Sequence, residues 1–173
     1  MNTSRKLLLA GAAVIATTAA ASSALAQASA TTSATASVTI FQPITITKTA
    51  DLSFGRVIRP STGTTIYTVS EATGATSVSG GDGIFTTGGG TPTRAAFTVN
   101  GEGGQAFNIT SDASVTNGGV TINLVKSAAT GTLSGTIGSA GSATFGVGGN
   151  VTLTNASATG VKSGTFNVTV SYQ

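Results

Sequence analysis

The chain of 173 residues contains neither cysteine nor histidine. Nucleophilic sites of the serine–histidine and cysteine–histidine kinds are therefore excluded, as are metal sites built from thiolates or imidazoles. The acidic residues are only five, and they occur singly at Asp51, Glu71, Asp82, Glu102 and Asp112. No two of them share one expected strand or turn, so each is predicted to be a solvated loop charge or a turn former. We expect no enzymatic activity and no cofactor.

Basic residues are also scarce, and two of the eight, Arg5 and Lys6, stand near the N-terminus. An apolar stretch follows over residues 7–21, and then the small residues Ala24-Leu25-Ala26. This order is typical of a secretory signal peptide. We predict a signal peptide over residues 1–26, with Ala24 and Ala26 at the cleavage site and Gln27 as the first residue of the exported chain.

The exported chain would keep six basic and five acidic residues. Such a balance provides no basic patch for nucleic acid or for an acidic membrane surface. We therefore expect no nucleic-acid partner and no membrane insertion after cleavage. Without cysteine, the stability of the exported domain must come from burial and from hydrogen bonding within sheets.

Short β-branched segments separated by glycine and asparagine dominate the rest of the chain, and this pattern is typical of an all-β sandwich. Asn100-Gly101, Asn117-Gly118-Gly119 and Gly148-Gly149-Asn150 are predicted to be tight turns. The glycine-flanked pair Ile84-Phe85 is predicted to belong to a surface excursion. The expected strands cover residues 37–47, 51–58, 64–70, 94–100, 105–110, 120–126, 143–147, 150–154 and 164–172.

The last ten residues alternate strictly between apolar and polar side chains. Phe166, Val168, Val170 and Tyr172 fall on one face of this expected strand, which ends almost at the C-terminal Gln173. A β-branched and aromatic strand of this kind belongs in a packed sheet. The sandwich is either complete in itself or lacks a final strand that a neighbouring chain supplies, and the sequence leaves both alternatives open.

Residues 27–37 form an uncharged N-terminal extension ahead of the expected domain, which covers residues 38–173. The extension is either a flexible leader or a strand that is donated to another chain. Its composition favours neither alternative. In the second case, the side chains presented on one face would be Ala28, Ala30, Ala34 and Ala36, joined by Val38 and Ile40.

The C-terminal pattern resembles the subunits that are assembled by the chaperone–usher route. In those pilins a glycine fourteen residues from the end and a penultimate tyrosine recur, and Gly160 and Tyr172 match them here. More broadly, residues 43–55, 96–102 and 164–172 resemble a bacterial secreted family of unknown function, allied to spore coat protein U and the archaic pilins. The absence of cysteine departs from the many pilins that carry a disulfide near the first strand.

The resemblance implies an immunoglobulin-like antiparallel β-sandwich that lacks its final strand. It further implies an exported structural subunit of a surface fibre, pilus or coat, assembled by donor-strand exchange. Its partners would be other copies of itself or related subunits, a periplasmic chaperone and an outer-membrane usher. Phe166, Val168, Val170, Tyr172 and Gln173 would form the accepting edge. The alternative is a self-complete secreted sandwich that acts as a binding or adhesion module.

Overall fold

The computed structural model describes residues 29–173, and the folded domain is the compact unit Thr39–Gln173. The preceding unit ends at Val38, one residue later than the predicted boundary of the extension, and its described part, residues 29–38, contains no strand. The first strand begins at Thr45 rather than at residue 37 as predicted. The expected cleavage residues Ala24, Ala26 and Gln27 lie outside the described residues, as does Ala28.

The domain consists of antiparallel strands, and the described part of the chain contains no helix, hence none that could span a membrane. This confirms the predicted all-β antiparallel sandwich. The strands are β1 (Thr45–Ala50), β2 (Val57–Ile58), β3 (Thr64–Val69), β4 (Thr76–Gly80), β5 (Ile84–Phe85), β6 (Ala95–Glu102), β7 (Ala106–Ser111), β8 (Ser114–Asn117), β9 (Val120–Lys126), β10 (Thr130–Thr132), β11 (Ala140–Thr154) and β12 (Val168–Tyr172).

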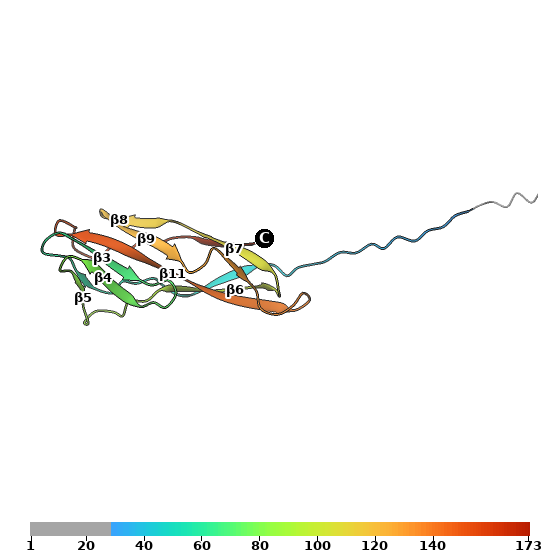
Figure 1. Ribbon diagram of the computed structural model, residues 1–173, viewed down its shortest axis with the longest axis horizontal. Coiled ribbons are helices and arrows are strands. Elements are labelled where there is room, and N and C mark those ends of the chain that lie inside the picture. Colours follow the sequence, from blue (N-terminus) through green and yellow to red (C-terminus); the bar gives the residue numbers. More distant parts are fainter. Residues whose placement is uncertain (1–28) are drawn as a thin grey trace, which may run out of the picture. The chain divides into compact units, whose positions relative to one another are not determined.

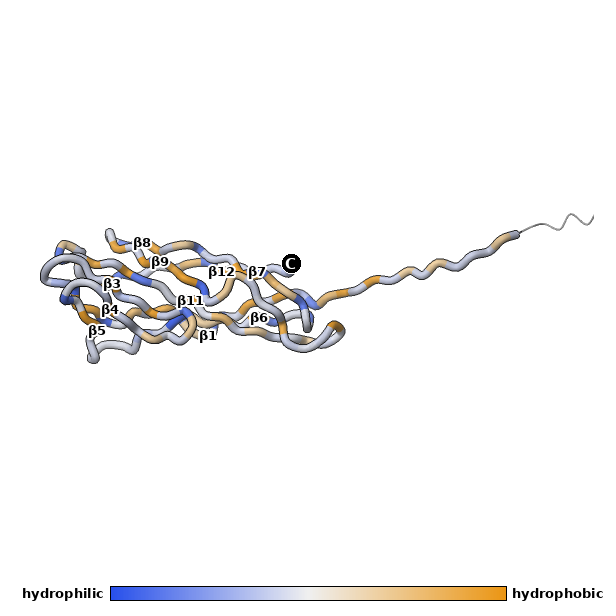
Figure 2. The backbone as a smooth tube through the Cα atoms, viewed as in Figure 1, coloured by the Kyte–Doolittle hydropathy of each residue, from blue (hydrophilic) through white to orange (hydrophobic). Residues whose placement is uncertain are grey.

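One layer is a seven-stranded sheet in the order β1-β6-β11-β3-β4, in which β9 pairs with β11 and β8 pairs with β9. The other layer is smaller and consists of a three-stranded sheet, β10-β7-β12, and a two-stranded sheet, β2-β5 (Figure 1). Along the strands, apolar and polar residues alternate (Figure 2), as expected when one face of a sheet is buried and the other is exposed.

The long strand β11 replaces the predicted hairpin at Gly148-Gly149-Asn150, and that prediction was wrong. The glycines lie inside the strand because neighbouring backbone approaches them closely on both sides. A Cβ on Gly148 would lie 2.2 Å from the carbonyl oxygen of Val69, and one on Gly149 would lie 2.3 Å from that of Asn123. Glycine within a strand here marks close backbone approach rather than a turn.

Two smaller predictions were also wrong. Asn100-Gly101 continues β6 instead of forming a turn, and the reversal comes at Gly104, whose φ is +73°. Phe85 pairs with Val57 and packs edge-on against Tyr67 with the ring centroids 5.5 Å apart, so it contributes to a core. The predicted turn at Gly118-Gly119 is confirmed by φ values of +54° and +76°.

The interior contains two hydrophobic clusters, and they divide the domain into two halves. In what we call the closed half, the three-stranded sheet covers β1, β6 and the first part of β11. Its buried residues are Ala95, Phe97, Val99, Phe107, Ile109, Leu133, Phe145 and Val147. In the open half, β3, β9 and the end of β11 carry a smaller cluster. Its buried residues are Tyr67, Val120, Val151 and Leu153.

Candidate functional site

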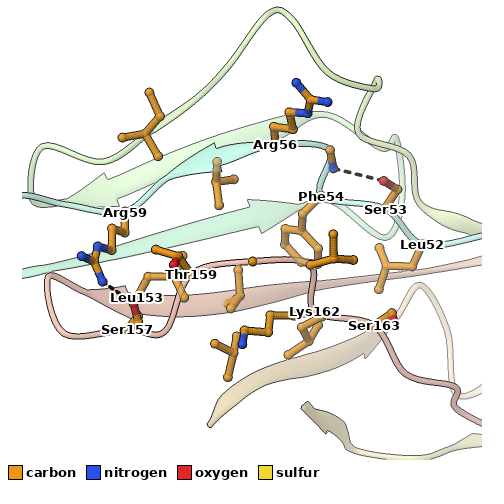
Figure 3. A pocket seen from close by; sticks show the side chains of 18 of the residues that line it. Leu52, Ser53, Phe54, Arg56, Arg59, Leu153, Ser157, Thr159, Lys162 and Ser163 are labelled. Carbon is orange, nitrogen blue, oxygen red and sulfur yellow. Dashed lines mark hydrogen bonds between the residues drawn. The ribbon is translucent and has the colours of Figure 1, made fainter. Parts of the chain in front are cut away.

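A groove of about 950 Å³ lies over the smaller cluster, in the open half. One wall is formed by residues 52–59 and the other by residues 157–164, and Figure 3 shows side chains from both walls facing each other. The sheet residues of β9 and β11 form its floor. Its apolar lining consists of Leu52, Phe54, Val57, Ile58, Val115, Val120, Ile122, Leu124, Val151, Leu153, Ala158, Val161 and Phe166. The groove therefore exposes part of the smaller cluster to solvent.

The second wall has a backbone without partners. Residues 158–166 make no backbone hydrogen bond to any other described residue and belong to no strand. The pairing of β12 with β7 extends to Asn167, whose N–H donates to Asp112 Oδ2 at 2.7 Å, and stops there. Buried backbone N–H and C=O groups in proteins are nearly always hydrogen-bonded, and exposed ones can bond to water instead. Because residues 158–161 and 163–165 are exposed, the backbone of this wall is open to solvent and free to pair with an added strand.

Two local features shape this wall. Gly160 has a φ of +98°, a left-handed conformation that interrupts the extended chain ahead of the predicted strand 164–172. A Cβ on Gly164 would lie 2.4 Å from Val115 Cγ1, so the wall passes β8 closely. β8 is itself paired with β9. The observed strand β12 accordingly begins at Val168.

The first wall is held in place by side chains. Tyr67 Oη donates to the carbonyl oxygen of Ile58, and Arg59 Nη1 donates to that of Ser157 at 2.5 Å. Arg59 therefore joins the two walls at one end of the groove. Burial raises the pKa of Tyr67 above its ordinary value, and nearby Asp82 adds to that effect. The pKa of Asp82 is lowered because the Ser61 hydroxyl and N–H both donate to its carboxylate.

At the other end, the sandwich is closed. Tyr172 Oη, at the end of β12, donates to the carbonyl oxygen of Gln42 at 2.8 Å. Beyond Tyr172, the N–H of Gln173 donates to the carbonyl oxygen of Ala106 at 3.2 Å. Odd-numbered residues of this strand thus bond to β7, and the backbone groups of Val168, Val170 and Tyr172 point to the free edge. The free edge of β12 therefore continues the unpaired wall.

The predicted accepting edge lies only partly at this groove. The alternation is confirmed, since Phe166, Val168, Val170 and Tyr172 are half-buried and the intervening residues are exposed. Their side chains pack into the cluster of the closed half. Of the residues predicted for the edge, only Gly160 and Phe166 line the groove.

The predicted donor residues stand in the non-strand segment before β1. Ala30, Ala34 and Ala36 are exposed, and Val38 and Ile40 are 82% and 81% exposed. Both bulky side chains are therefore available for burial elsewhere.

Sequence reasoning missed the floor of the groove, although a signal was present. Val120, Ile122 and Leu124 alternate within one expected strand, and Val151 and Leu153 alternate within another. This pattern indicates a buried face but cannot reveal that a groove lies over it. The groove depends on where residues 157–166 lie, and residues 157–163 follow no secondary-structure pattern.

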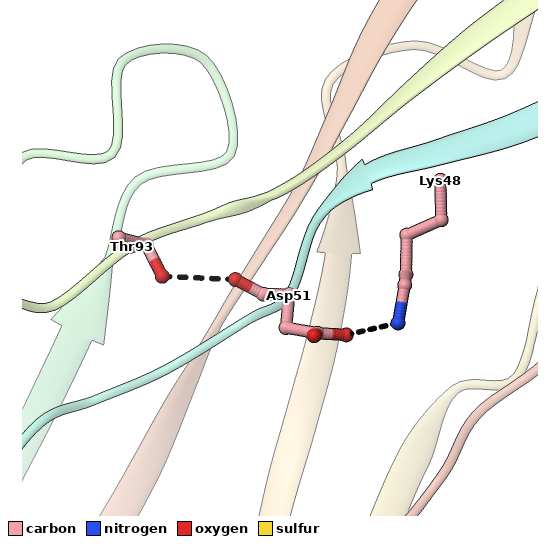
Figure 4. A network of polar contacts seen from close by, with 3 residues as sticks. All are labelled: Lys48, Asp51 and Thr93. Atoms are coloured by element: carbon pink, nitrogen blue, oxygen red, sulfur yellow. Dashed lines mark hydrogen bonds and ion pairs between the residues drawn. The ribbon is translucent and has the colours of Figure 1, made fainter.

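The acidic residues do not meet in one place. Within residues 29–173, no cluster of three acidic residues could hold a metal ion. Lys48 Nζ and Asp51 Oδ1 form an exposed ion pair at 2.6 Å, and the Asp51 carbonyl oxygen accepts a hydrogen bond from Thr93 Oγ1 (Figure 4). Glu102 is only 2% exposed, so its predicted role as a solvated loop charge was wrong. Its surroundings are described below.

A family model described as "Domain of unknown function (DUF4402)" matches residues 44–172. The match begins two residues after Gln42 and ends at Tyr172, so it includes both walls of the groove and both hydrophobic clusters. It leaves the N-terminal extension outside. No curated protein and no solved structure matches the chain.

Proposed function

Because the chain belongs to the DUF4402 family, whose name assigns no function, we propose a function from the geometry of the groove. The protein is an exported structural subunit of a surface fibre, pilus or coat. Its groove accepts the N-terminal extension of a second copy, which completes the sandwich as an added strand. The observation that carries this proposal is the unpaired backbone of residues 158–166 beside the apolar floor.

The unpaired backbone favours a peptide strand over an apolar small molecule as the occupant. A small apolar ligand would cover Phe54 and Leu153 but would leave the N–H and C=O groups of the wall without partners. An extended peptide would cover the apolar floor and also pair with the wall, since its alternate side chains enter the groove while its backbone bonds to the wall. Occupancy by a strand would also remove a free sheet edge, which invites aggregation.

The extension of a second copy has the length and the charge that the groove requires. Residues 29–41 would extend over about 43 Å, whereas the nine residues of the wall span at most about 30 Å. The extension carries no charge, and three basic but no acidic residues line the groove, so no like charges meet. Val38 and Ile40 would be the bulky side chains that enter it. They bury more apolar area than the alanines, at about 25 cal/mol per Å².

The positions of donor and acceptor favour exchange between copies rather than within one chain. Gln42, in the segment that leads from the extension into β1, lies beside Tyr172 in the closed half, whereas the groove lies in the open half. Contacts of this head-to-tail kind do not close into a ring unless a rotation permits it, and they generate fibres. The resemblance to archaic pilins and spore coat protein U agrees with this reading. It adds a periplasmic chaperone and an outer-membrane usher as expected partners.

The absence of cysteine permits a direct test. One copy carries Ile40→Cys and another carries Thr159→Cys in the wall, and the two purified full-length proteins are mixed under mild oxidation. We expect a mixed disulfide between the two copies, because the extension of one lies in the groove of the other. Replacing Thr159→Cys by Val78→Cys on β4, which does not line the groove, should abolish it.

A second pair of variants separates the two faces of the inserted strand. Ile40→Asp should stop assembly, because a carboxylate cannot enter the apolar groove, whereas Thr39→Asp on the opposite face should be tolerated. The readout is the size distribution by light scattering. Equal assembly of both variants, or a soluble monomer of the unaltered chain that never assembles, would contradict the proposal. The second result would favour the alternative of a self-complete binding or adhesion module.

A further inference from the structure

Gln42 lies between the extension and β1, and side chains hold both polar groups of its backbone. Its N–H donates to Glu102 Oε2 at 3.2 Å, and its carbonyl oxygen accepts a hydrogen bond from Tyr172 Oη at 2.8 Å. Gln42 belongs to no strand. At Gln42, where the chain passes from the extension into the domain, the backbone is therefore held by two side chains from distant parts of the sequence rather than by sheet pairing.

Glu102 is the less expected of the two side chains, because it is buried without a cation. Its other oxygen, Oε1, accepts a hydrogen bond from the N–H of Gly138, and no lysine or arginine among the described residues forms an ion pair with it. Burial of a carboxylate is costly unless hydrogen bonds compensate for the lost water. An apolar side chain could fill this place but could not hold the N–H of Gln42.

Tyr172 connects the same point to the end of β12. Its hydroxyl accepts a hydrogen bond from the N–H of Glu102 at 2.7 Å, and its ring packs against Phe41 with the centroids 5.8 Å apart. Gly101 makes room for this hydroxyl, since a Cβ there would lie 2.2 Å from Tyr172 Oη. The side chains of Glu102 and Tyr172 thus meet at the backbone of Gln42 and are themselves linked by the N–H of Glu102.

We propose that Glu102 and Tyr172 form a clasp that fixes the point from which the extension leaves the domain. Both are positioning residues, since they act on the backbone of Gln42 and not on the accepting groove. Anchoring by the clasp stands on its own geometry. Its consequence for assembly rests on the proposed function. If the extension is a donor strand, holding its attachment point at Gln42 sets the orientation between successive copies.

The test is amide hydrogen exchange in the full chain, resolved at Gln42, Gly138 and Glu102. Glu102→Gln keeps the volume of the side chain but places an amide donor against the N–H of either Gln42 or Gly138. We expect one of these two amides to exchange about tenfold faster as a result. Tyr172→Phe removes only the hydroxyl, and we expect a similar acceleration at the amide of Glu102.

Matched controls come from the same chain. Glu71→Gln changes a glutamate whose carboxylate bonds no other described residue, and Tyr67→Phe changes the other tyrosine. Neither should alter exchange at Gln42. Unchanged exchange at Gln42, Gly138 and Glu102 in folded Glu102→Gln and Tyr172→Phe proteins would overturn the clasp. If Glu102→Gln does not fold, Tyr172→Phe decides alone. Exchange of residues 158–166 reports strand insertion separately, so failure of the clasp and failure of the proposed function can be told apart.

Discussion

The closed and open halves of the domain share the central strand β11 but differ in what covers it. In the closed half, the three-stranded sheet β10-β7-β12 lies over eight buried residues. In the open half, the cover consists of the two-residue strands β2 and β5 and the unpaired segment 158–166. The sandwich of the closed half therefore has two complete layers, whereas the second layer of the open half is incomplete. The groove thus lies where packing stops, not where unusual residues gather, and this is the surface that we propose as functional.

The largest effect is expected when one leucine in each half is replaced by alanine. Leu133 is 1% exposed in the closed half and Leu153 is 8% exposed in the floor of the groove. Leu133→Ala should lower the free energy of unfolding by about 2–5 kcal/mol, because it leaves an enclosed cavity. Leu153→Ala should cost about 2 kcal/mol or less, because only the transfer of a few methyl groups is lost beside an open groove. Urea unfolding of both variants measures the difference.

In assembly we expect the opposite order of effects, with Leu153→Ala the more damaging of the two variants. Leu153→Ala should weaken the binding of a second copy's extension, whereas Leu133→Ala should leave it unchanged in protein that remains folded. Equal losses of stability in the two variants would mean that the groove is as well packed as the closed half.

The two tyrosines offer a smaller comparison, since each holds a backbone carbonyl in its own half. Tyr67→Phe removes the hydrogen bond to Ile58 and should cost about 1 kcal/mol. Amide exchange should rise in residues 56–58 but not in residues 39–44. A rise in residues 39–44 would show that the halves are not independent.

The raised pKa of Tyr67 adds a pH dependence with a defined sign. Folding favours the neutral phenol, so this contribution to stability is complete below the ordinary tyrosine pKa of about 10. It is lost as the pH rises through the higher pKa of the folded state. The difference in stability between the unaltered chain and Tyr67→Phe should therefore shrink above about pH 10. A constant difference across that range would contradict the assigned cause.

The smallest expected effect concerns Asp82, which accepts hydrogen bonds from Ser61 at the edge of the open half. Its lowered pKa means that its contribution is complete above the ordinary aspartate pKa of about 3.9 and is lost as the pH falls through the lower folded value. Asp82→Asn should remove this acid dependence, together with the small contribution of the charged carboxylate at neutral pH. Thermal unfolding between pH 2 and 5 provides the measurement, and an identical acid profile for both proteins would contradict it.

The sequence was sufficient to predict most strands in both halves, but not the groove of the open half or the surroundings of Glu102 in the closed half. Strand β9 and the alternation of the C-terminal strand follow directly from the period-two pattern. Gly148-Gly149 was misread because glycine at a turn and glycine at a close approach look alike in sequence. The groove was missed because residues 158–163, which form most of its wall, carry no periodic pattern. Glu102 was missed because its partners, Gln42, Gly138 and Tyr172, come together only in the fold.

Under the proposed function, residues 158–166 gain a backbone partner only when a second copy supplies one. Amide hydrogen exchange of this segment, compared between the free subunit and the assembled form, tests it most directly. We predict rapid exchange of residues 158–166 in the free subunit and strong protection after assembly, with little change in β11 of the closed half. Protection of this segment already in the free subunit, or continued rapid exchange in the assembled form, would contradict the account.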